Sequence, residues 1–224
     1  MKVGEIITMF KQFANESDTT FLTATDIGTY LSQGYREFRA LVTDLAPETY
    51  QQSQTYTLSG TDRLDLATST PALLNTSGST LMTNLLHVVI VSDAAGNDEL
   101  EYLDGGPHKG VAPFFGYSLE GTTLRFGGDR TGTVRIDYVP EHTVEFDSSA
   151  GVGYDANAIP DFLLAYHPLI ALYGYRYYAI RDGGLPPELQ LQYRDLENKL
   201  REYLASSRDR GGSTYVNYYH ADLY

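Results

Sequence analysis

The spacing of hydrophobic residues changes twice along the chain. Apolar residues recur at helical spacing up to Leu45 and again after Ile159, whereas apolar and polar residues alternate between Gln54 and Val139. The first spacing predicts amphipathic helices and the second predicts antiparallel strands. Two helix pairs so far apart in the sequence form one bundle only if the strand region is an insertion. The sequence therefore predicts an α+β fold, in which N- and C-terminal helix pairs form a helical bundle with a small inserted antiparallel β region.

The first two helices have clear sequence boundaries. Residues 3–14 carry apolar side chains at helical spacing and predict a short amphipathic helix. Thr23, followed three positions later by Asp26, predicts a capping box that starts the second helix, with Thr25 as the alternative N-cap. Pro47 requires that helix to end before it. Gly34 interrupts the apolar stripe of the second helix, at a cost of about 1 kcal/mol relative to alanine. This favours a close crossing with another helix there, the alternative being a glycine that is merely tolerated.

A third helix is predicted from Ile159 to Arg181, with Pro160 at its first position and a kink at Pro168. His167, beside this proline, is interpreted as a kink partner that bonds a backbone group. Apolar residues occupy almost every face of the helix, and a helix of that kind is buried on every face. Three helices of the same chain would leave one face in water, so we expect a neighbouring subunit to cover it. The residues predicted at this subunit interface are Leu172, Tyr173, Tyr175 and Tyr177.

The β region is predicted to consist of short strands joined by tight turns. Gln54–Leu58 and Asp62–Leu66 flank a Ser-Gly-Thr turn, which predicts a hairpin. Thr122–Phe126 and Thr133–Val139 flank a stretch that begins Gly127-Gly128, which predicts another hairpin. The predicted organisation is residues 1–50 and 159–210 as the helical bundle, 51–147 as the inserted β region, 148–158 as a linker and 211–224 as an arm.

An aromatic segment follows the last helix, which starts at Pro186 and has an ordinary amphipathic pattern. Gly211-Gly212 provides a hinge, and the segment behind it is rich in tyrosine. Tyrosine suits a surface that is wet before assembly and buried after it. We therefore predict an extended C-terminal arm that docks on another chain, whether as an added strand or by its side chains. The docking residues are Tyr215, Val216, Tyr218, Tyr219, Leu223 and Tyr224.

Composition narrows the classes of function. The formal charge of -13 argues against sequence-reading contact with nucleic acid, which needs clustered lysine and arginine. It is compatible with a wall that DNA slides past, since an acidic lining repels the phosphate backbone. The chain has no cysteine, and its five histidines lack metal-ligand spacing, so we expect neither a metal nor a cofactor. Phe162 to Ile180 is nearly continuous in apolar residues, but it contains His167, Pro168 and Arg176, so we expect no membrane span.

Catalytic motifs are lacking, and we do not expect an enzyme. The sequence has no serine-nucleophile elbow, no phosphate-binding glycine loop and no zinc-protease motif. His108, in a glycine-containing loop, is the best remaining candidate because functional groups favour exposed loops. Three interpretations are left: an assembly subunit, a non-enzymatic binding module whose β region recognises a glycan or a protein, and, as the weakest, a hydrolase around His108.

Three stretches, taken in order, resemble one protein family. They are Val3–Met9 together with Tyr30–Phe38, then Ile159–Tyr173, and finally Tyr193–Arg201. With the helix, strand and helix order and the arm, they make the chain similar to the head-to-tail adaptor (connector) proteins of short-tailed bacteriophages. The resemblance covers most of the chain.

The resemblance implies a place in the neck of a virion, after assembly in the host cytoplasm. The family forms a ring, commonly of twelve copies, beneath the portal vertex. Its C-terminal arms would grip the portal protein, and its other face would receive a tail nozzle or further tail proteins. DNA would pass through the ring without sequence-specific binding.

Overall fold

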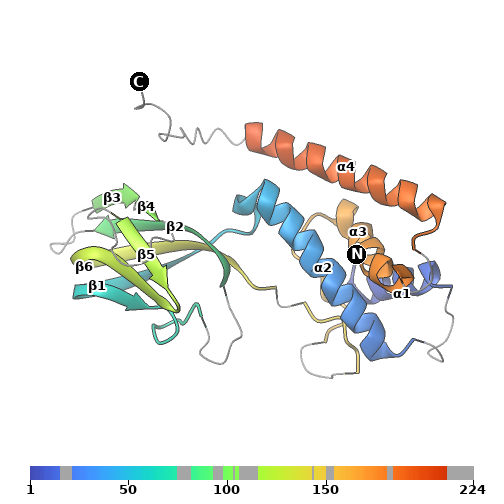
Figure 1. The fold of residues 1–224 in the computed structure, drawn as a ribbon, viewed down its shortest axis with the longest axis horizontal. Helices are drawn as coiled ribbons and strands as arrows, with labels where there is room; N and C mark the ends of the chain where they lie inside the picture. Colours follow the sequence, from blue (N-terminus) through green and yellow to red (C-terminus); the bar gives the residue numbers. More distant parts are fainter. Residues whose placement is uncertain are drawn as a thin grey trace. The chain divides into compact units, whose positions relative to one another are not determined.

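The computed structural model of the chain describes residues 1–15, 22–74, 82–92, 98–102, 104–105, 116–142, 144–149, 154–180 and 184–210. The chain divides into two compact units, Met1–Ala46 with Thr143–Tyr224, and Pro47–His142. Figure 1 shows long helices in the first unit and a sheet in the second. The prediction of a fold that combines helices with mainly antiparallel strands is confirmed.

The first unit contains four α-helices among its described residues: α1 (Val3–Phe13), α2 (Ala24–Leu45), α3 (His167–Ala179) and α4 (Pro187–Arg210). The start of α2 confirms the predicted capping box. The Asp26 amide donates to the Thr23 hydroxyl, and the Thr23 amide donates to the Asp26 carboxylate, each over 3.1 Å. These two bonds satisfy backbone donors that a helix start leaves without partners in the helix.

α2 and α3 cross where two glycines meet. A Cβ atom on Gly34 of α2 would lie 2.4 Å from the amide nitrogen of Gly174 and 2.9 Å from the carbonyl oxygen of Ile170, both on α3. A Cβ on Gly174 would lie 3.1 Å from the carbonyl oxygen of Tyr30. The close crossing predicted at Gly34 is therefore confirmed, and α3 is the helix that crosses there.

α3 is shorter than the sequence predicts, and the predicted kink is wrong. The helix begins at His167, so Pro168 lies in its first turn, where the missing N–H leaves no hydrogen bond unmade. A proline deeper inside a helix would remove such a bond and clash with the preceding turn. The residues before α3 are irregular apart from η2 (Leu164–Tyr166), a single 3-10 turn.

The chain itself buries α3. The helix packs against α1, α2 and α4, and nine of its 13 residues are buried. Of the residues predicted at a subunit interface, Leu172, Tyr173 and Tyr175 are 0%, 2% and 8% exposed, and Tyr177 is half-buried. Intrachain packing accounts for the apolar character of α3, which removes the sequence argument for placing these residues between subunits.

The second unit is built around one long strand. Its described strands are β1 (Gln52–Asp65), β2 (Met82–Ser92), β3 (Asp98–Tyr102), β4 (Asp104–Gly105), β5 (Gly116–Glu120) and β6 (Thr123–Pro140), and η1 (Pro47–Tyr50) precedes them. β6 pairs antiparallel with β1, β2 and β5, while β3 pairs antiparallel with β2. The short β4 pairs with β5 in parallel. Alternate residues of the long strands, such as Val134 and Ile136 on β6, form a common hydrophobic core.

Both predicted hairpins are wrong, because each is one continuous strand. β1 and β6 pair with each other from Gln52 opposite Tyr138 to Asp65 opposite Thr123. The two glycine-containing stretches predicted as turns lie opposite each other, where the register shifts, and Gly60 has a φ of +63°. Both strands therefore bulge at the same place and neither turns back.

We predict that Gly34→Ala lowers the free energy of unfolding by about 1–3 kcal/mol, because the new methyl group would overlap the backbone of α3. Gly128→Ala is the matched control, since a Cβ at Gly128 meets no atom within 4 Å. Chemical denaturation measures both variants. A Gly34→Ala protein as stable as the Gly128→Ala protein would reject the close approach of α2 and α3.

Candidate interaction surface

The residues that lead into α3 expose large apolar side chains. Ile159, Leu163 and Leu164 are 56%, 45% and 60% exposed. Across the described residues, seven large hydrophobic side chains are exposed, so this short segment accounts for three of them. Tyr203 of α4 is 40% exposed, and its ring centroid lies 5.8 Å from that of Tyr166. These five residues are called the apolar surface below.

Asp161 fixes the backbone of this segment to α2. The hydroxyl of Tyr35 and the guanidinium of Arg39 donate hydrogen bonds to its two carboxylate oxygens. Tyr35 and Arg39 are almost fully buried, at 0% and 5% exposure. Burial, together with the charge of Asp161, raises the pKa of Tyr35 well above its ordinary value, so the hydroxyl remains a donor at neutral pH. The Asp161 carboxylate thus accepts hydrogen bonds from two buried side chains of α2.

His167 holds the other end of the segment. Its ring is fully buried, and Nε2 lies 2.9 Å from the carbonyl oxygen of Phe162, while Nδ1 lies 2.9 Å from the Met1 amino nitrogen. Burial lowers the pKa of His167, so the ring is neutral at pH 7 and donates from Nε2 to Phe162. The interpretation of His167 as a residue that bonds a backbone group is confirmed, although no kink accompanies it.

Ring packing completes the attachment of the segment. The Phe162 ring meets the Phe38 ring of α2 edge to face, with centroids 5.3 Å apart, and Pro160 is buried. The segment therefore combines anchored residues with exposed ones. Because its backbone is held, the exposed aliphatic side chains cannot easily turn inward. Exposed apolar residues close together in the sequence, on a held backbone, make this segment a candidate protein interaction site.

A second cluster joins α4 to the other helices. The guanidinium of Arg176 donates two hydrogen bonds to the Glu37 carboxylate, over 2.6 and 2.7 Å, and one to the Tyr193 hydroxyl over 3.1 Å. It also lies 5.7 Å from the Tyr173 ring centroid and 5.5 Å from that of Tyr177. Two of the residues predicted at a subunit interface therefore surround an arginine within the same chain.

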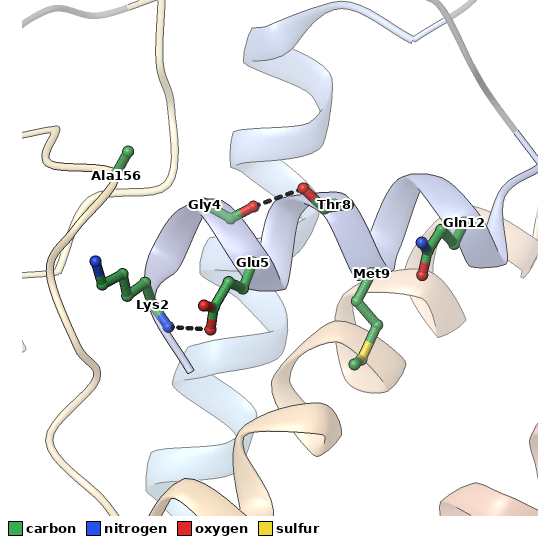
Figure 2. A pocket seen from close by; sticks show the side chains of 7 residues that line it. All are labelled: Lys2, Gly4, Glu5, Thr8, Met9, Gln12 and Ala156. Atoms are coloured by element: carbon green, nitrogen blue, oxygen red, sulfur yellow. Dashed lines mark hydrogen bonds between the residues drawn. The ribbon is translucent and has the colours of Figure 1, made fainter.

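A shallow depression of about 360 Å³ lies over the exposed face of α1 (Figure 2). Its lining is Lys2, Gly4, Glu5, Thr8, Met9, Gln12 and Ala156. Backbone groups already join its two walls, because the Gly4 amide donates to the carbonyl oxygen of Ala156 over 3.0 Å. Lys2 Nζ also donates to the Asn157 side chain over 3.0 Å. We interpret the depression as the seam where residues 156–158 cap the start of α1.

Several residues singled out in the sequence lie outside the described residues. They are His108 and the six predicted docking residues of the arm: Tyr215, Val216, Tyr218, Tyr219, Leu223 and Tyr224. Within the described parts of the chain, no three histidine, aspartate or glutamate side chains gather as a metal ion would need. The described helices include none with the length and apolar character to cross a membrane.

Sequence reasoning missed the apolar surface because it assigned four of its five residues, Ile159, Leu163, Leu164 and Tyr166, to a buried helix. An exposed interaction site and a buried helix face use the same aliphatic residues, so apolar character alone does not separate them. Pro168 was the available signal: a helix with this proline in its first turn leaves Ile159 to Tyr166 outside it.

Comparison with known proteins adds no identification, since no family model and no curated protein matches the chain.

We predict that Asp161→Ala lowers the free energy of unfolding by about 1–3 kcal/mol, because it removes the acceptor of two buried donors. Asp195→Ala is the matched control. Asp195 pairs with Lys199 on an exposed face of α4, with its side chain 62% exposed, and such pairs contribute about 0–1 kcal/mol. Urea unfolding followed by circular dichroism measures both, and equal losses would count against the anchoring role of Asp161.

A second prediction concerns pH. Because the pKa of His167 is lower in the folded chain than in the unfolded chain, the unfolded state takes up the proton first as pH falls. His167 should therefore reduce stability progressively below its ordinary pKa of about 6.5. Unfolding free energies at pH 7.5 and pH 5.5 should differ more for the wild type than for His167→Gln. An equal pH dependence in the two proteins would show that His167 does not contribute.

Proposed function

We propose that the protein is a structural subunit of a ring that joins the head of a short-tailed bacteriophage to its tail. The observation that carries this proposal is the apolar surface, whose aliphatic side chains are exposed on a backbone fixed by Asp161 and His167. A surface of this kind suits burial against another protein and has no evident part in catalysis.

The arrangement of the helices supports the same proposal. α1 and α2 come from one end of the sequence and α3 and α4 from the other, and α3 packs against the other three. We propose that these helix pairs form the bundle of an adaptor subunit and that the sheet unit is its insertion. The arm, residues 211–224, would grip the portal protein, and the opposite face of the ring would meet a tail nozzle or other tail proteins.

A ring requires each copy to offer two different surfaces, one to each neighbour. Burying the exposed part of one half-exposed leucine or isoleucine contributes on the order of 1 kcal/mol. The three aliphatic residues of the apolar surface would therefore contribute a few kcal/mol to each contact. A closed ring of about twelve copies repeats that contact at every boundary, so individually modest contacts support a stable assembly.

The charge of the chain suits the proposed channel. A net charge of -13 on each copy would give the ring a strongly acidic character. Acidic walls repel the phosphate backbone and keep DNA from adhering as it passes. We therefore propose that DNA crosses the ring without sequence-specific binding.

We predict that Leu164→Asp blocks assembly while leaving the helical unit folded, because Leu164 is 60% exposed and lies outside the buried core of that unit. An aspartate there would place an unpaired charge in the proposed contact. The measurement is the mass by light scattering, alone and after mixing with DNA-filled heads that lack tails. The wild type should join the heads as a ring, and the variant should remain at 24.9 kDa.

Leu191→Asp is the matched control, because Leu191 is an exposed leucine of the same unit, at 69%, outside the apolar surface. This variant should assemble like the wild type. A wild-type protein that stays monomeric with heads present would overturn the proposed function. Normal assembly of Leu164→Asp would instead move the contact away from the apolar surface.

A further inference from the structure

The apolar surface lies beside the helix from which the arm emerges. Tyr203 belongs to α4 and contributes to this surface through its contact with Tyr166. α4 ends at Arg210, seven residues further on, and residues 211–224 follow. At 1.5 Å per helical residue, the arm therefore begins about 10 Å along the helix from Tyr203.

The arm is long enough to return to this surface. An extended chain advances about 3.3 Å per residue. If the chain reverses at Gly211-Gly212, which adopt left-handed turn conformations readily, the next three residues cover about 10 Å. Tyr215 then reaches the level of Tyr203, and nine residues remain to extend across Leu163 and Leu164.

The composition of the arm matches the surface. Residues 213–224 carry five large apolar or aromatic side chains beyond Tyr215, and Asp222 has the only side chain among them that is fully charged at neutral pH. Such a segment can cover aliphatic side chains without burying unpaired charges. Tyrosine hydroxyls can remain in water at the edge of the contact while their rings lie on Ile159, Leu163 and Leu164.

We infer that, in the free chain, residues 213–224 dock on the apolar surface of the same chain. The same chain is the favoured source because a short tether gives the arm an effective concentration in the millimolar range, above that of other copies in solution. Docking would cover Ile159, Leu163, Leu164 and Tyr203 until another protein takes the arm.

This inference goes beyond the proposed function. If the arm is later drawn to a portal protein, the apolar surface becomes available to a neighbouring copy at that moment. The chain would then be held back from assembling before it meets its partner. Docking of the arm in the free chain does not require the chain to form a ring.

Photo-crosslinking of the full-length free chain tests the inference. The crosslinking amino acid p-benzoylphenylalanine is placed at Tyr218, and a dilute equal mixture of unlabelled and 15N-labelled protein is illuminated. Peptide mass spectrometry should then find crosslinks from residue 218 to residues 159–166 or to Tyr203. Each linked pair should contain peptides of one isotope only, because the contact lies within one chain.

Two variants sharpen the result. Leu163→Ser combined with Leu164→Ser should reduce the crosslink yield about tenfold, because it removes the aliphatic contact. Leu191→Ser, outside the surface, should leave the yield unchanged. Crosslinks of mixed isotope would overturn the inference in favour of arms exchanged between copies. Crosslinks elsewhere, none at all, or a yield unaffected by the double serine variant would also overturn it. No head or portal protein is present, so failure of the proposed ring does not affect this outcome.

Discussion

The crossing of α2 and α3 at Gly34 and Gly174 is the constraint on which the helical unit depends. Only the absence of side chains allows the two backbones to approach so closely. The approach places Glu37, one turn after Gly34, within hydrogen-bonding distance of Arg176 on α3. Arg176 also donates a hydrogen bond to the Tyr193 hydroxyl of α4. The same stretch of α2 carries the donors that hold Asp161. The position of the apolar surface therefore follows from a packing contact that lies outside it.

Local signals in the sequence were sufficient where the structure has a local cause. The capping box at Thr23 and the end of α2 before Pro47 each rest on backbone chemistry within a few residues. The close approach at Gly34 involves a distant helix, but the missing side chain that permits it is read at Gly34 itself. Either Pro160 or Pro168 can occupy the first turn of a helix, so the start of α3 could not be identified from the prolines alone. Helical periodicity favoured Pro160, because the exposed residues that follow it are as apolar as buried ones.

Features with a distant cause were not predictable in the same way. A glycine-containing stretch between two apolar runs suits a turn or a bulge, and the choice depends on the strand opposite. Gly60 faces the irregular part of β6, some 70 residues away, so no local pattern around it identifies the bulge. The burial of α3 is similar. Its sequence shows that the helix is covered, and the packing of α1, α2 and α4 shows what covers it.

The pairing of Gln52 with Tyr138 has a consequence for the order in which the chain folds. α2 is synthesised roughly 120 residues before α3. At a synthesis rate of 5–20 residues per second, the face of α2 that carries Gly34 remains without α3 for on the order of 10 s. The sheet unit is continuous in sequence and emerges during that interval. Once formed, it holds the start of β1 beside the end of β6, which replaces a very long loop by a short one. Most of the loop-closure entropy that bringing α2 to α3 would cost has then already been lost when the sheet unit folds.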